Sequence, residues 1–369
     1  MKTHFIIFTI LFFIINTYPI IRFWRLSGSG LQSKPFRVTI LAILIVLALC
    51  FPFSFLAQFK DIASQTTIGT LQTLGGIWLG FLLYSIIGFT ITDILYWCKV
   101  LRSRRLRLYI PIIGTIFLLI YGNLKYHHPS IERYTIELND NGERFQQSTP
   151  FRIVVASDIH LGHSTGKAQL NKFVELINGE NPDLILLAGD IIDNDIRPVV
   201  NDKMDEELFR LNSTYGTYAV VGNHEYISGI DKSLNFLNKT DITILRDSVV
   251  TIADKIQIIG RDDRSNHKRK PLEDLIAQTH NTIPTLLLDH QPYNLKQADS
   301  LGTDIQCYGH THNGQMWPLN LLIKNMYEQG YGYRKWENSH IFVSSGLSLW
   351  GPKFRIGTQS EIIVIDLIQ

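Results

Sequence analysis

Hydrophobic positions along this chain follow two patterns, and the change between them falls near residue 126. Before that point, apolar residues form long runs that we interpret as four spans, at about 5–21, 38–56, 68–97 and 108–121. Runs of about 17–25 apolar residues suffice to cross the hydrocarbon core of a bilayer as a helix. The fourth span is short and contains Pro111. We therefore expect a transmembrane region of about four helices over residues 1–126, with the lipid bilayer as a partner.

A cleaved signal peptide is the alternative interpretation of the first span, because Lys2 precedes its apolar run. However, the run ends in Tyr18–Trp24, which contains no small-residue cleavage site. This sequence favours retention of the span as a helix.

After residue 150, the apolar residues form short β-branched runs with helix-period stretches such as Leu170–Ile177 between some of them. Alternating strands and helices predict an α/β domain over residues 151–369. A polar junction at 127–150 precedes it, with a turn at Asn139–Gly142 and a possible leading strand at Tyr134–Leu138. The predicted strands are Arg152–Ala156, Leu184–Ala188, Tyr218–Val221, Thr285–Leu288 and Asp304–Tyr308.

Positive charge lies mainly on one side of the predicted spans, and cytoplasmic loops are the ones that retain Lys and Arg. The opposite side has only Lys2, Lys60, Lys125 and Arg133. With four spans, this asymmetry places the α/β domain outside the cytoplasm. The residues on the positive side are Arg22, Arg25, Lys34 and Arg37 in the first loop, and Lys99, Arg102, Arg104, Arg105 and Arg107 in the second.

Composition narrows the function only slightly. A formal net charge of +2, with the basic residues concentrated in the topology loops, gives no reason to expect a nucleic-acid partner. Three cysteines predict no disulfide framework. Asp93 lies inside the third span, where it is either functional or, as we favour, near the membrane interface.

A polar block directly follows each of the five predicted strands. Residues just past buried strands are held rigidly and project into a cleft, so the blocks can converge. Any one block occurs by chance, but five in succession are unlikely to do so. The blocks are Asp158-Ile159-His160, Gly189-Asp190, Gly222-Asn223-His224-Glu225, His290 and Gly309-His310-Thr311-His312.

Aspartate and histidine ligands without thiolates suit Mn, Fe or Zn. Two ions need a bridging carboxylate, and Asp190 is the natural candidate because Gly189 allows a tight turn before it. Two divalent ions about 3.5–4 Å apart clamp the attacking and leaving groups of phosphoester hydrolysis. We expect one ion at Asp158, His160, Asp190 and His312, and the other at Asp190, Asn223, His290 and His310.

His224 remains after the ligands are assigned, and we predict that it protonates the leaving alkoxide. Asp193 and Glu225 are candidates to orient the ligands. Capping of the following helix is an equal alternative for Asp193.

Three other segments are candidates for substrate contacts. Arg355 and the Arg261–Arg264 cluster can reach phosphate oxygens, although solvation at the surface explains the cluster equally well. The apolar segment Met316–Ile323 can seat an acyl chain or enter the membrane interface. For that segment we favour a packed loop under the second sheet.

These residues resemble the calcineurin-like metallophosphoesterases, whose pattern is Asp-x-His, Gly-Asp, Gly-Asn-His-Glu, His and Gly-His-x-His. The resemblance runs from Arg152 to the end and implies a four-layer α/β/β/α sandwich with a binuclear metal site. The chain looks most like the membrane-anchored bacterial branch, given Gly309–Gln315 and Gly357–Glu361. Asn313 stands where that branch usually has glycine.

The resulting expectation is a membrane-bound phosphoesterase that cleaves a phosphomonoester, phosphodiester or pyrophosphate of a small molecule, a lipid or an envelope component. Similar proteins cleave the pyrophosphate of UDP-2,3-diacylglucosamine, but that lipid is made on the cytoplasmic side. It is therefore the alternative substrate if the domain is cytoplasmic. An alternative of another class is a non-catalytic membrane sensor or transport protein, which would have no need of His224.

Overall fold

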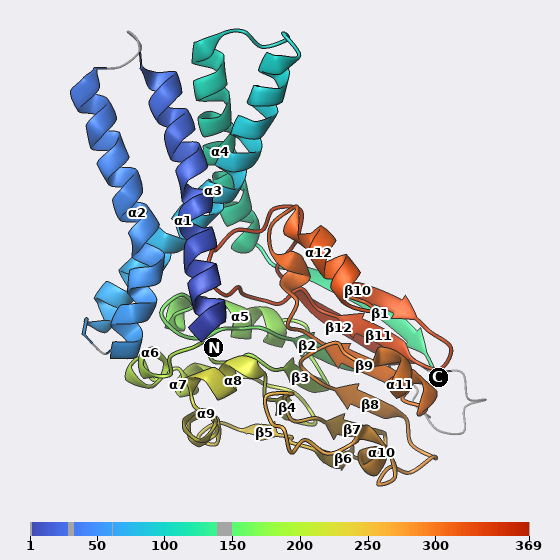
Figure 1. Ribbon diagram of the computed structural model, residues 1–369. Coiled ribbons are helices and arrows are strands. Elements are labelled where there is room, and N and C mark those ends of the chain that lie inside the picture. The colour runs from blue at the N-terminus through green and yellow to red at the C-terminus, as the bar shows by residue number, and fades with distance from the viewer. Residues whose placement is uncertain (1, 29–32, 61, 139–149, 369) are drawn as a thin grey trace. The chain divides into compact units, whose positions relative to one another are not determined.

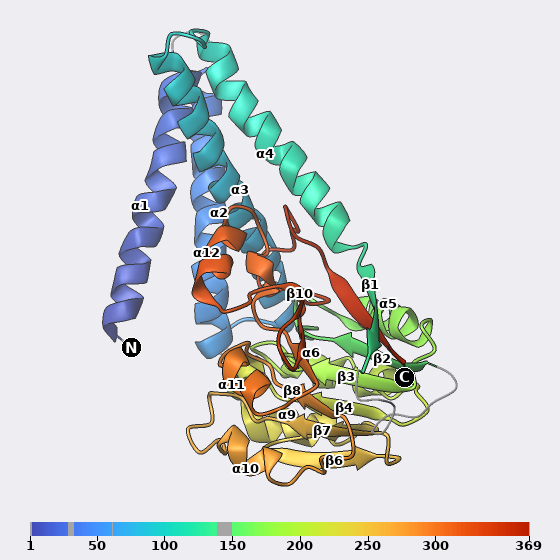
Figure 2. The same cartoon turned by 90° about the vertical axis from the view of Figure 1, so that its right-hand side faces the viewer.

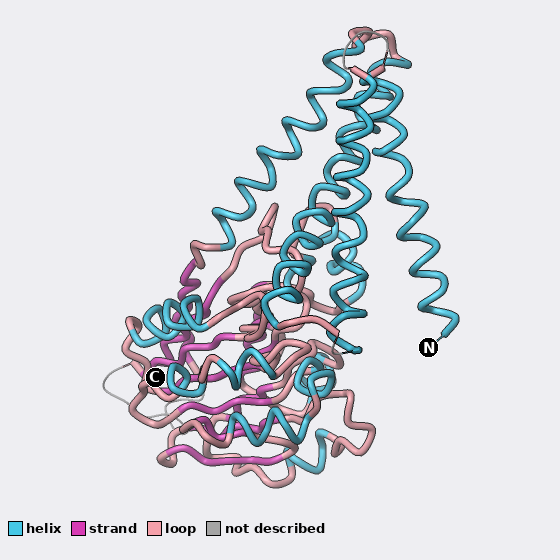
Figure 3. The backbone as a smooth tube through the Cα atoms, turned by 90° about the vertical axis from the view of Figure 1, so that its left-hand side faces the viewer, coloured by secondary structure: helices cyan, strands magenta, loops and turns pink. Residues whose placement is uncertain are grey.

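The computed structural model describes residues 2–28, 33–60, 62–138 and 150–368 (Figure 1). The predicted turn at 139–142 lies outside these residues. The chain divides into two compact units, Met1–Leu124 with Gly351–Phe354, and Lys125–Trp350 with Arg355–Gln369. The strands are confined to the second unit, whereas the long helices belong to the first (Figure 3).

Four helices build the first unit at the positions of the predicted spans. They are α1 (Lys2–Ser27), α2 (Lys34–Lys60), α3 (Gln65–Trp97) and α4 (Arg104–Tyr126). Within the residues that the structure describes, α2, α3 and α4 are long and apolar enough to cross a membrane. Because α4 continues through Pro111, it is longer than the predicted span.

Asp93 on α3 connects three helices of the first unit. Its carboxylate accepts hydrogen bonds from the Tyr18 hydroxyl at 3.0 Å and from Arg107 Nη2 at 3.1 Å, and it pairs with Arg22. Tyr18 and Arg22 lie on α1, and Arg107 lies on α4. Asp93 therefore holds α1, α3 and α4 together through charge.

Two six-stranded mixed sheets form the centre of the second unit. The first has the order β1-β12-β2-β3-β4-β5 and is parallel from β2 to β5. The second has the order β10-β11-β9-β8-β7-β6 and is parallel from β11 to β7. The strands are β1 (Ser130–Glu137), β2 (Phe151–Ala156), β3 (Leu184–Ala188), β4 (Thr217–Val220), β5 (Ile242–Ile244), β6 (Ser248–Ile252), β7 (Ile256–Gly260), β8 (Thr285–Leu288), β9 (Ile305–Tyr308), β10 (Gly332–Lys335), β11 (His340–Val343) and β12 (Glu361–Ile368).

Helices cover the outer faces of both sheets (Figures 1 and 2). Apolar side chains of the two inner faces pack against each other, including Ile153 and Leu186 from one sheet and Leu286 from the other. This arrangement is the predicted α/β/β/α sandwich. The first sheet is covered by α5 (Lys167–Asn178), α6 (Arg197–Asn201), α7 (Asp205–Leu208) and α9 (Ile230–Leu237), and the second by α10 (Leu272–Ile276) and α11 (Leu295–Ser300).

Part of the predicted junction belongs to the sandwich. The expected leading strand begins earlier than Tyr134, at Ser130, and forms β1. This strand pairs in parallel with β12 along its whole length, from Ser130 opposite Glu361 to Glu137 opposite Ile368.

Helix α12 (Leu319–Met326) differs from the prediction that we favoured for its segment. None of its residues is buried, and the exposed fractions of Leu321, Leu322 and Met326 are 51%, 58% and 66%. The expectation of a packed loop is therefore wrong here, because the apolar side chains face outward.

Candidate metal centre

All seven predicted metal ligands lie just past the carboxyl ends of strands. Because β2, β3 and β4 are parallel neighbours in one sheet, and β8 and β9 are parallel neighbours in the other, their ends converge at one edge of the sandwich. The strands and the ligands that follow them are β2 with Asp158 and His160, β3 with Asp190, β4 with Asn223, β8 with His290, and β9 with His310 and His312.

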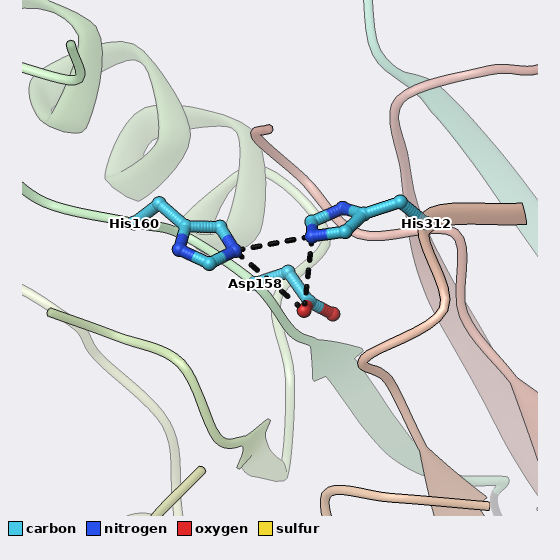
Figure 4. A group of neighbouring side chains, drawn as sticks. All are labelled: Asp158, His160 and His312. Atoms are coloured by element: carbon cyan, nitrogen blue, oxygen red, sulfur yellow. Dashed lines mark hydrogen bonds and ion pairs between the residues drawn. The ribbon is translucent and has the colours of Figure 1, made fainter. Parts of the chain in front are cut away.

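The first ligand group is formed by Asp158, His160 and His312, whose polar atoms face one another (Figure 4). His160 Nε2 lies 3.1 Å from His312 Nε2. Oδ1 of Asp158 lies 3.8 Å from His160 Nε2 and 3.6 Å from His312 Nε2. These three atoms can contact one ion.

The second ligand group gathers around His290 Nε2. This atom lies 3.1 Å from Asp190 Oδ2, 3.2 Å from His310 Nδ1 and 3.2 Å from Asn223 Oδ1. The structure thus brings together all four residues that the sequence assigned to the second ion.

Asp190 faces both groups. Its Oδ2 lies 3.9 Å from His160 Nε2, in addition to its contact with His290. His224 Nε2 is also 3.9 Å from the same oxygen, so His160, Asp190 and His224 form a third possible ligand group.

The spacing of these atoms fits a divalent metal ion. Two ligand atoms that each lie about 2.1 Å from one ion are about 3.0–3.4 Å apart, which matches the two nitrogen–nitrogen contacts, 3.1 Å and 3.2 Å. Buried Nδ1 atoms of His160 and His312 have no hydrogen-bond partner. The donor set of imidazole, carboxylate and amide suits Mn, Fe or Zn.

Most of the imidazoles are held neutral, as metal ligation requires. Burial and the neighbouring His290 lower the pKa of His310 to about 4. Burial and Arg355 lower the pKa of His312 to about 3. Burial, together with His224, holds the pKa of His160 well below its usual range.

His290 has the opposite electrostatic environment. Burial by itself lowers its pKa, but the carboxylates of Asp190, Asp158 and Asp263 together outweigh burial and raise the pKa well above the usual range. Nδ1 of His290 donates to the carbonyl of Ala188 at 2.8 Å, which leaves Nε2 directed at Asp190. The carboxylate therefore favours a cation at Nε2, and a metal ion can take the place of the proton.

The backbone at the site is unusual in a way that the sequence does not reveal. Five of the ligands have positive φ, a region that residues other than glycine rarely adopt and that often marks functional sites. Gly189 also has a φ of +80°, and a Cβ on it would lie 2.7 Å from His290 Nδ1. The five ligands are Asp158 (55°), His160 (50°), Asp190 (51°), His310 (72°) and His312 (50°).

Glu225 positions the backbone around Asp190. Its carboxylate accepts hydrogen bonds from the backbone N–H groups of Gly222 at 2.7 Å, Ile192 at 2.8 Å and Asp190 at 3.1 Å. Burial raises the pKa of Glu225 to about 7. This residue therefore orients one ligand loop and lies behind the ligands.

Asp193 contacts His224 and caps no helix. Its Oδ1 lies 3.0 Å from His224 Nδ1 and 3.8 Å from His160 Nδ1. The helix that follows, α6, has Ile196 at its N-cap and no side-chain cap. The capping alternative is therefore wrong.

His224 lies at the edge of the site. Burial by itself lowers its pKa, but the carboxylates of Asp190 and Asp193 outweigh burial and raise the pKa to about 9. Its ring packs edge-on against His160, with centroids 4.6 Å apart, and lies 6.3 Å from the Trp350 ring.

Arg355 does not reach a substrate. Its side chain is completely buried and donates to the carbonyl oxygens of His312, Ser345, Gly346 and Ser348. Because these donors are already engaged with the backbone, the prediction of a phosphate contact is corrected. Arg355 instead fixes the loop that carries His312.

One segment of the site was missed by the sequence analysis, the loop that follows β11. Its backbone N–H groups donate to the strand-end residues of β2, from Leu347 to Ser157 at 2.9 Å and from Ser348 to Asp158 at 3.0 Å. The signal was present, because the apolar run Ile341–Val343 is followed by polar Ser344 and Ser345, as the other strands are followed by polar blocks.

Comparisons with known proteins agree with this geometry. Residues 151–314 match the family model described as Calcineurin-like phosphoesterase. A metallophosphoesterase of Helicobacter pylori strain J99 is 32% identical over 270 residues, which span 72% of this chain and 70% of the relative.

Two more distant matches extend the comparison. A Danio rerio relative named "Transmembrane protein with metallophosphoesterase domain" is 30% identical over 278 residues, 70% of this chain and 62% of the relative. The structure of a 5'-nucleotidase precursor from Thermus thermophilus is 15% identical, with a TM-score of 0.36, and covers 59% of this chain and 55% of that chain.

Proposed function

Because this chain belongs to the calcineurin-like metallophosphoesterase family, we propose that its second unit uses two divalent metal ions to hydrolyse a phosphomonoester, phosphodiester or pyrophosphate bond. The position of Asp190 carries the proposal. Its Oδ2 lies 3.1 Å from His290 Nε2 and 3.9 Å from His160 Nε2. One carboxylate thus faces both ligand groups, as a pair of ions about 3.5–4 Å apart requires.

The ligand assignment follows the two groups. Asp158, His160, Asp190 and His312 would hold one ion, and Asp190, Asn223, His290 and His310 the other. When bound, the ions supply Lewis-acid chemistry that polarises phosphoryl oxygens and activates water.

His224 supplies the proton for the leaving group in this proposal. Its Nδ1 donates to Asp193, which fixes the ring and leaves Nε2 directed toward the metal site. Asp193 lies outside the proposed ligand set, and its carboxylate raises the pKa of His224, which favours a proton on Nε2. A positioned general acid of this kind contributes about 10²–10⁴-fold to turnover.

The experiment that tests the proposal compares turnover with metal content. Purified protein loaded with Mn should hydrolyse an aryl phosphodiester, and His224→Ala should lose about 10²–10⁴-fold in kcat while keeping its Mn. His280→Ala is the matched control, because His280 is an exposed histidine of the same unit. Undiminished turnover would remove His224 from the acid role, and loss of one ion would make it a ligand.

We further propose that the substrate is a lipid or another amphiphile of the envelope. Helix α12 supports this, because its exposed apolar side chains begin a few residues after His312, with Leu321 and Leu322 on the surface. Amphipathic helices with an exposed apolar face enter membrane interfaces. Helices α2, α3 and α4, which are long and apolar enough to cross a membrane, would hold the same chain at a bilayer.

The positive loops favour an extracytoplasmic site in this proposal. If the site were cytoplasmic, the pyrophosphate of UDP-2,3-diacylglucosamine would be the substrate to test. A non-catalytic sensor or transport protein would bind a phosphorylated ligand and show no turnover in the same assay.

A further inference from the structure

The loops that follow β7 and β8 enclose an open cavity of about 360 Å³ with an excess of positive charge, which we call the basic cavity. Such a volume suits a small ligand or one part of a larger ligand. Two carboxylates, of Glu273 and Asp289, also line it. Its four cationic side chains are Arg261, Arg264, Arg269 and Lys270.

The two carboxylates offset only part of the positive charge of the basic cavity. Asp289 is buried and pairs with Arg269 alone among these cations. Glu273 accepts a hydrogen bond from Gln297 Nε2 at 2.6 Å. Among the described residues, Arg261, Arg264 and Lys270 therefore form no close ion pair with a lining carboxylate, although Asp289 and Glu273 both interact with the charge of Arg261.

The two inner arginines of the cavity are incompletely satisfied. Arg261 donates from Nη2 to the carbonyl of Lys270 at 2.8 Å, and its buried Nε has no acceptor. Arg269 also has a buried Nε without an acceptor. A guanidinium group has five N–H donors, and removing them from water without acceptors is unfavourable. An anion with several oxygens would provide acceptors for the unpaired Nε–H groups of Arg261 and Arg269.

Aromatic rings link the basic cavity to the metal site. Arg264 lies over the Tyr293 ring, 4.4 Å from its centroid, and Tyr293 packs on Tyr327 at 5.0 Å. The Tyr327 ring is 6.5 Å from that of His310. On the other side, Asp289 and Gln291 of the cavity wall flank His290 in the chain. The cavity is therefore a neighbour of the metal site, separated from it by two rings.

From this arrangement we infer that the basic cavity binds a second phosphate group of the substrate. Arginine binds phosphate through paired charge-assisted hydrogen bonds, and the outer Arg264 and Lys270 can supply further donors. Because two rings lie between the cavity and His310, a linker such as a sugar separates the two phosphates, so that they are not adjacent in a pyrophosphate. This inference rests on the proposed function, since it takes the metal site as the place of the first phosphate.

The test compares two sugar phosphates that differ only in the second group. Binding of glucose 1,6-bisphosphate and of glucose 1-phosphate is measured by calorimetry on the full chain loaded with Mn. A His224→Ala background keeps the probes from being consumed. We expect the bisphosphate to bind at least about tenfold more tightly, with one molecule per chain. Two molecules of either probe per chain would place a separate anion in the cavity and overturn the inference, as would equal affinities.

Variants of the cavity test whether the tighter binding of the bisphosphate depends on the cavity residues. Arg264→Gln and Lys270→Gln should each weaken bisphosphate binding several-fold and leave glucose 1-phosphate binding unchanged. Both residues are exposed, so the fold tolerates the changes. Lys268→Gln is the matched control, because it removes an exposed charge from the same loop outside the cavity lining. Equal weakening by the control, or weakening for both probes, would contradict the assignment.

These outcomes are separable from the failure of the proposed function. Hydrolysis of an aryl phosphodiester by the wild type tests the metal site alone, since that substrate has no second phosphate. A chain that lacks turnover but discriminates between the two probes would refute the proposed function and retain the cavity as an anion site. A chain that hydrolyses the aryl phosphodiester but binds both sugar phosphates equally would support the proposed function and refute the second phosphate site.

Discussion

Individual residues behind the ligands decide how well the proposed metal centre binds its ions, and Glu225 is the most constrained of them. Its carboxylate accepts three backbone N–H groups and is completely buried. Glu225→Gln would place an amide N–H₂ against these donors. We expect a loss of about 10–100-fold in apparent Mn affinity, the usual effect of changing such a partner.

Titrating Mn into the activity assay measures this effect. Excess Mn should restore part of the turnover in Glu225→Gln, because the ligands themselves remain. Glu175→Gln is the control, an exposed glutamate on α5. Equal Mn affinity in Glu225→Gln and the wild type would show that the carboxylate does not position Asp190.

His340 gives the second unit a pH dependence that is independent of the metal site. Burial, with a smaller effect of Lys335, lowers its pKa to about 4, while an unfolded chain binds a proton near pH 6.5. Between these values the unfolded state binds more protons, so stability falls as pH falls from 7 toward 4. Neutral Nδ1 accepts the Tyr333 hydroxyl at 3.0 Å.

The measurement for His340 is the thermal unfolding midpoint of the detergent-purified chain at pH 7.5 and pH 5. His340→Asn should lower the midpoint at pH 7.5, because the stacking on Tyr333 is lost, and should reduce the drop between the two pH values. The same drop in variant and wild type would contradict the role of His340.

Residue types and positions sufficed to predict which candidate ligands come together, because strand ends of parallel sheets meet at one edge. The backbone conformation of those ligands was not predictable, since positive φ at Asp158 or His310 is imposed by the surrounding packing. Arg355 was predicted wrongly for a related reason. Nothing in its neighbours indicates that its donors are taken by buried carbonyls from distant segments.

At the scale of elements, strands were predicted best and amphipathic segments worst. The five runs of apolar residues became β2, β3, β4, β8 and β9 almost at the predicted ends. The segment that became α12 is apolar enough for a core, and its exposure depends on what the fold leaves uncovered.

Helix α12 carries the prediction that belongs to this scale. If its apolar face enters the bilayer interface, Leu321→Asn with Leu322→Asn should lower turnover of a phospholipid in vesicles several-fold, because the face loses apolar area. Turnover of a soluble aryl phosphodiester should not change. Phe209→Asn is the control, since Phe209 is equally exposed at the end of α7.

The measurement is the ratio of phospholipid turnover to aryl phosphodiester turnover, with both rates taken from one preparation of each variant. Equal losses on both substrates would show that α12 supports the fold of the site. Unchanged rates on both would show that the exposed face has no part in reaching the substrate.

For the whole molecule, the change of pattern near residue 126 predicted a helical part followed by an α/β part. It did not predict that Gly351–Phe354, far along the chain, belongs to the first unit. Within that unit, Asn123 Nδ2 donates to the carbonyl of Lys353 at 3.1 Å. Contacts between such distant segments leave no periodicity in the sequence, so only the folded structure reveals them.

The last prediction concerns the side of the membrane on which the metal site lies. Cys98 is exposed and begins the second positive loop, whereas Cys50 and Cys307 are buried. The positive loops predict that Cys98 faces the cytoplasm. A membrane-impermeant maleimide should therefore label it in inverted vesicles and not in intact cells.

A second thiol reports on the catalytic unit. Ser265→Cys in a Cys98→Ser background places a cysteine at an exposed position of the loop after β7. We expect labelling of this cysteine in intact cells, because one predicted span, the one that forms α4, lies between Cys98 and the second unit. Labelling only in inverted vesicles would mean that one predicted span does not cross the bilayer. The site would then be cytoplasmic, and a lipid-linked nucleotide sugar would become the substrate to test first.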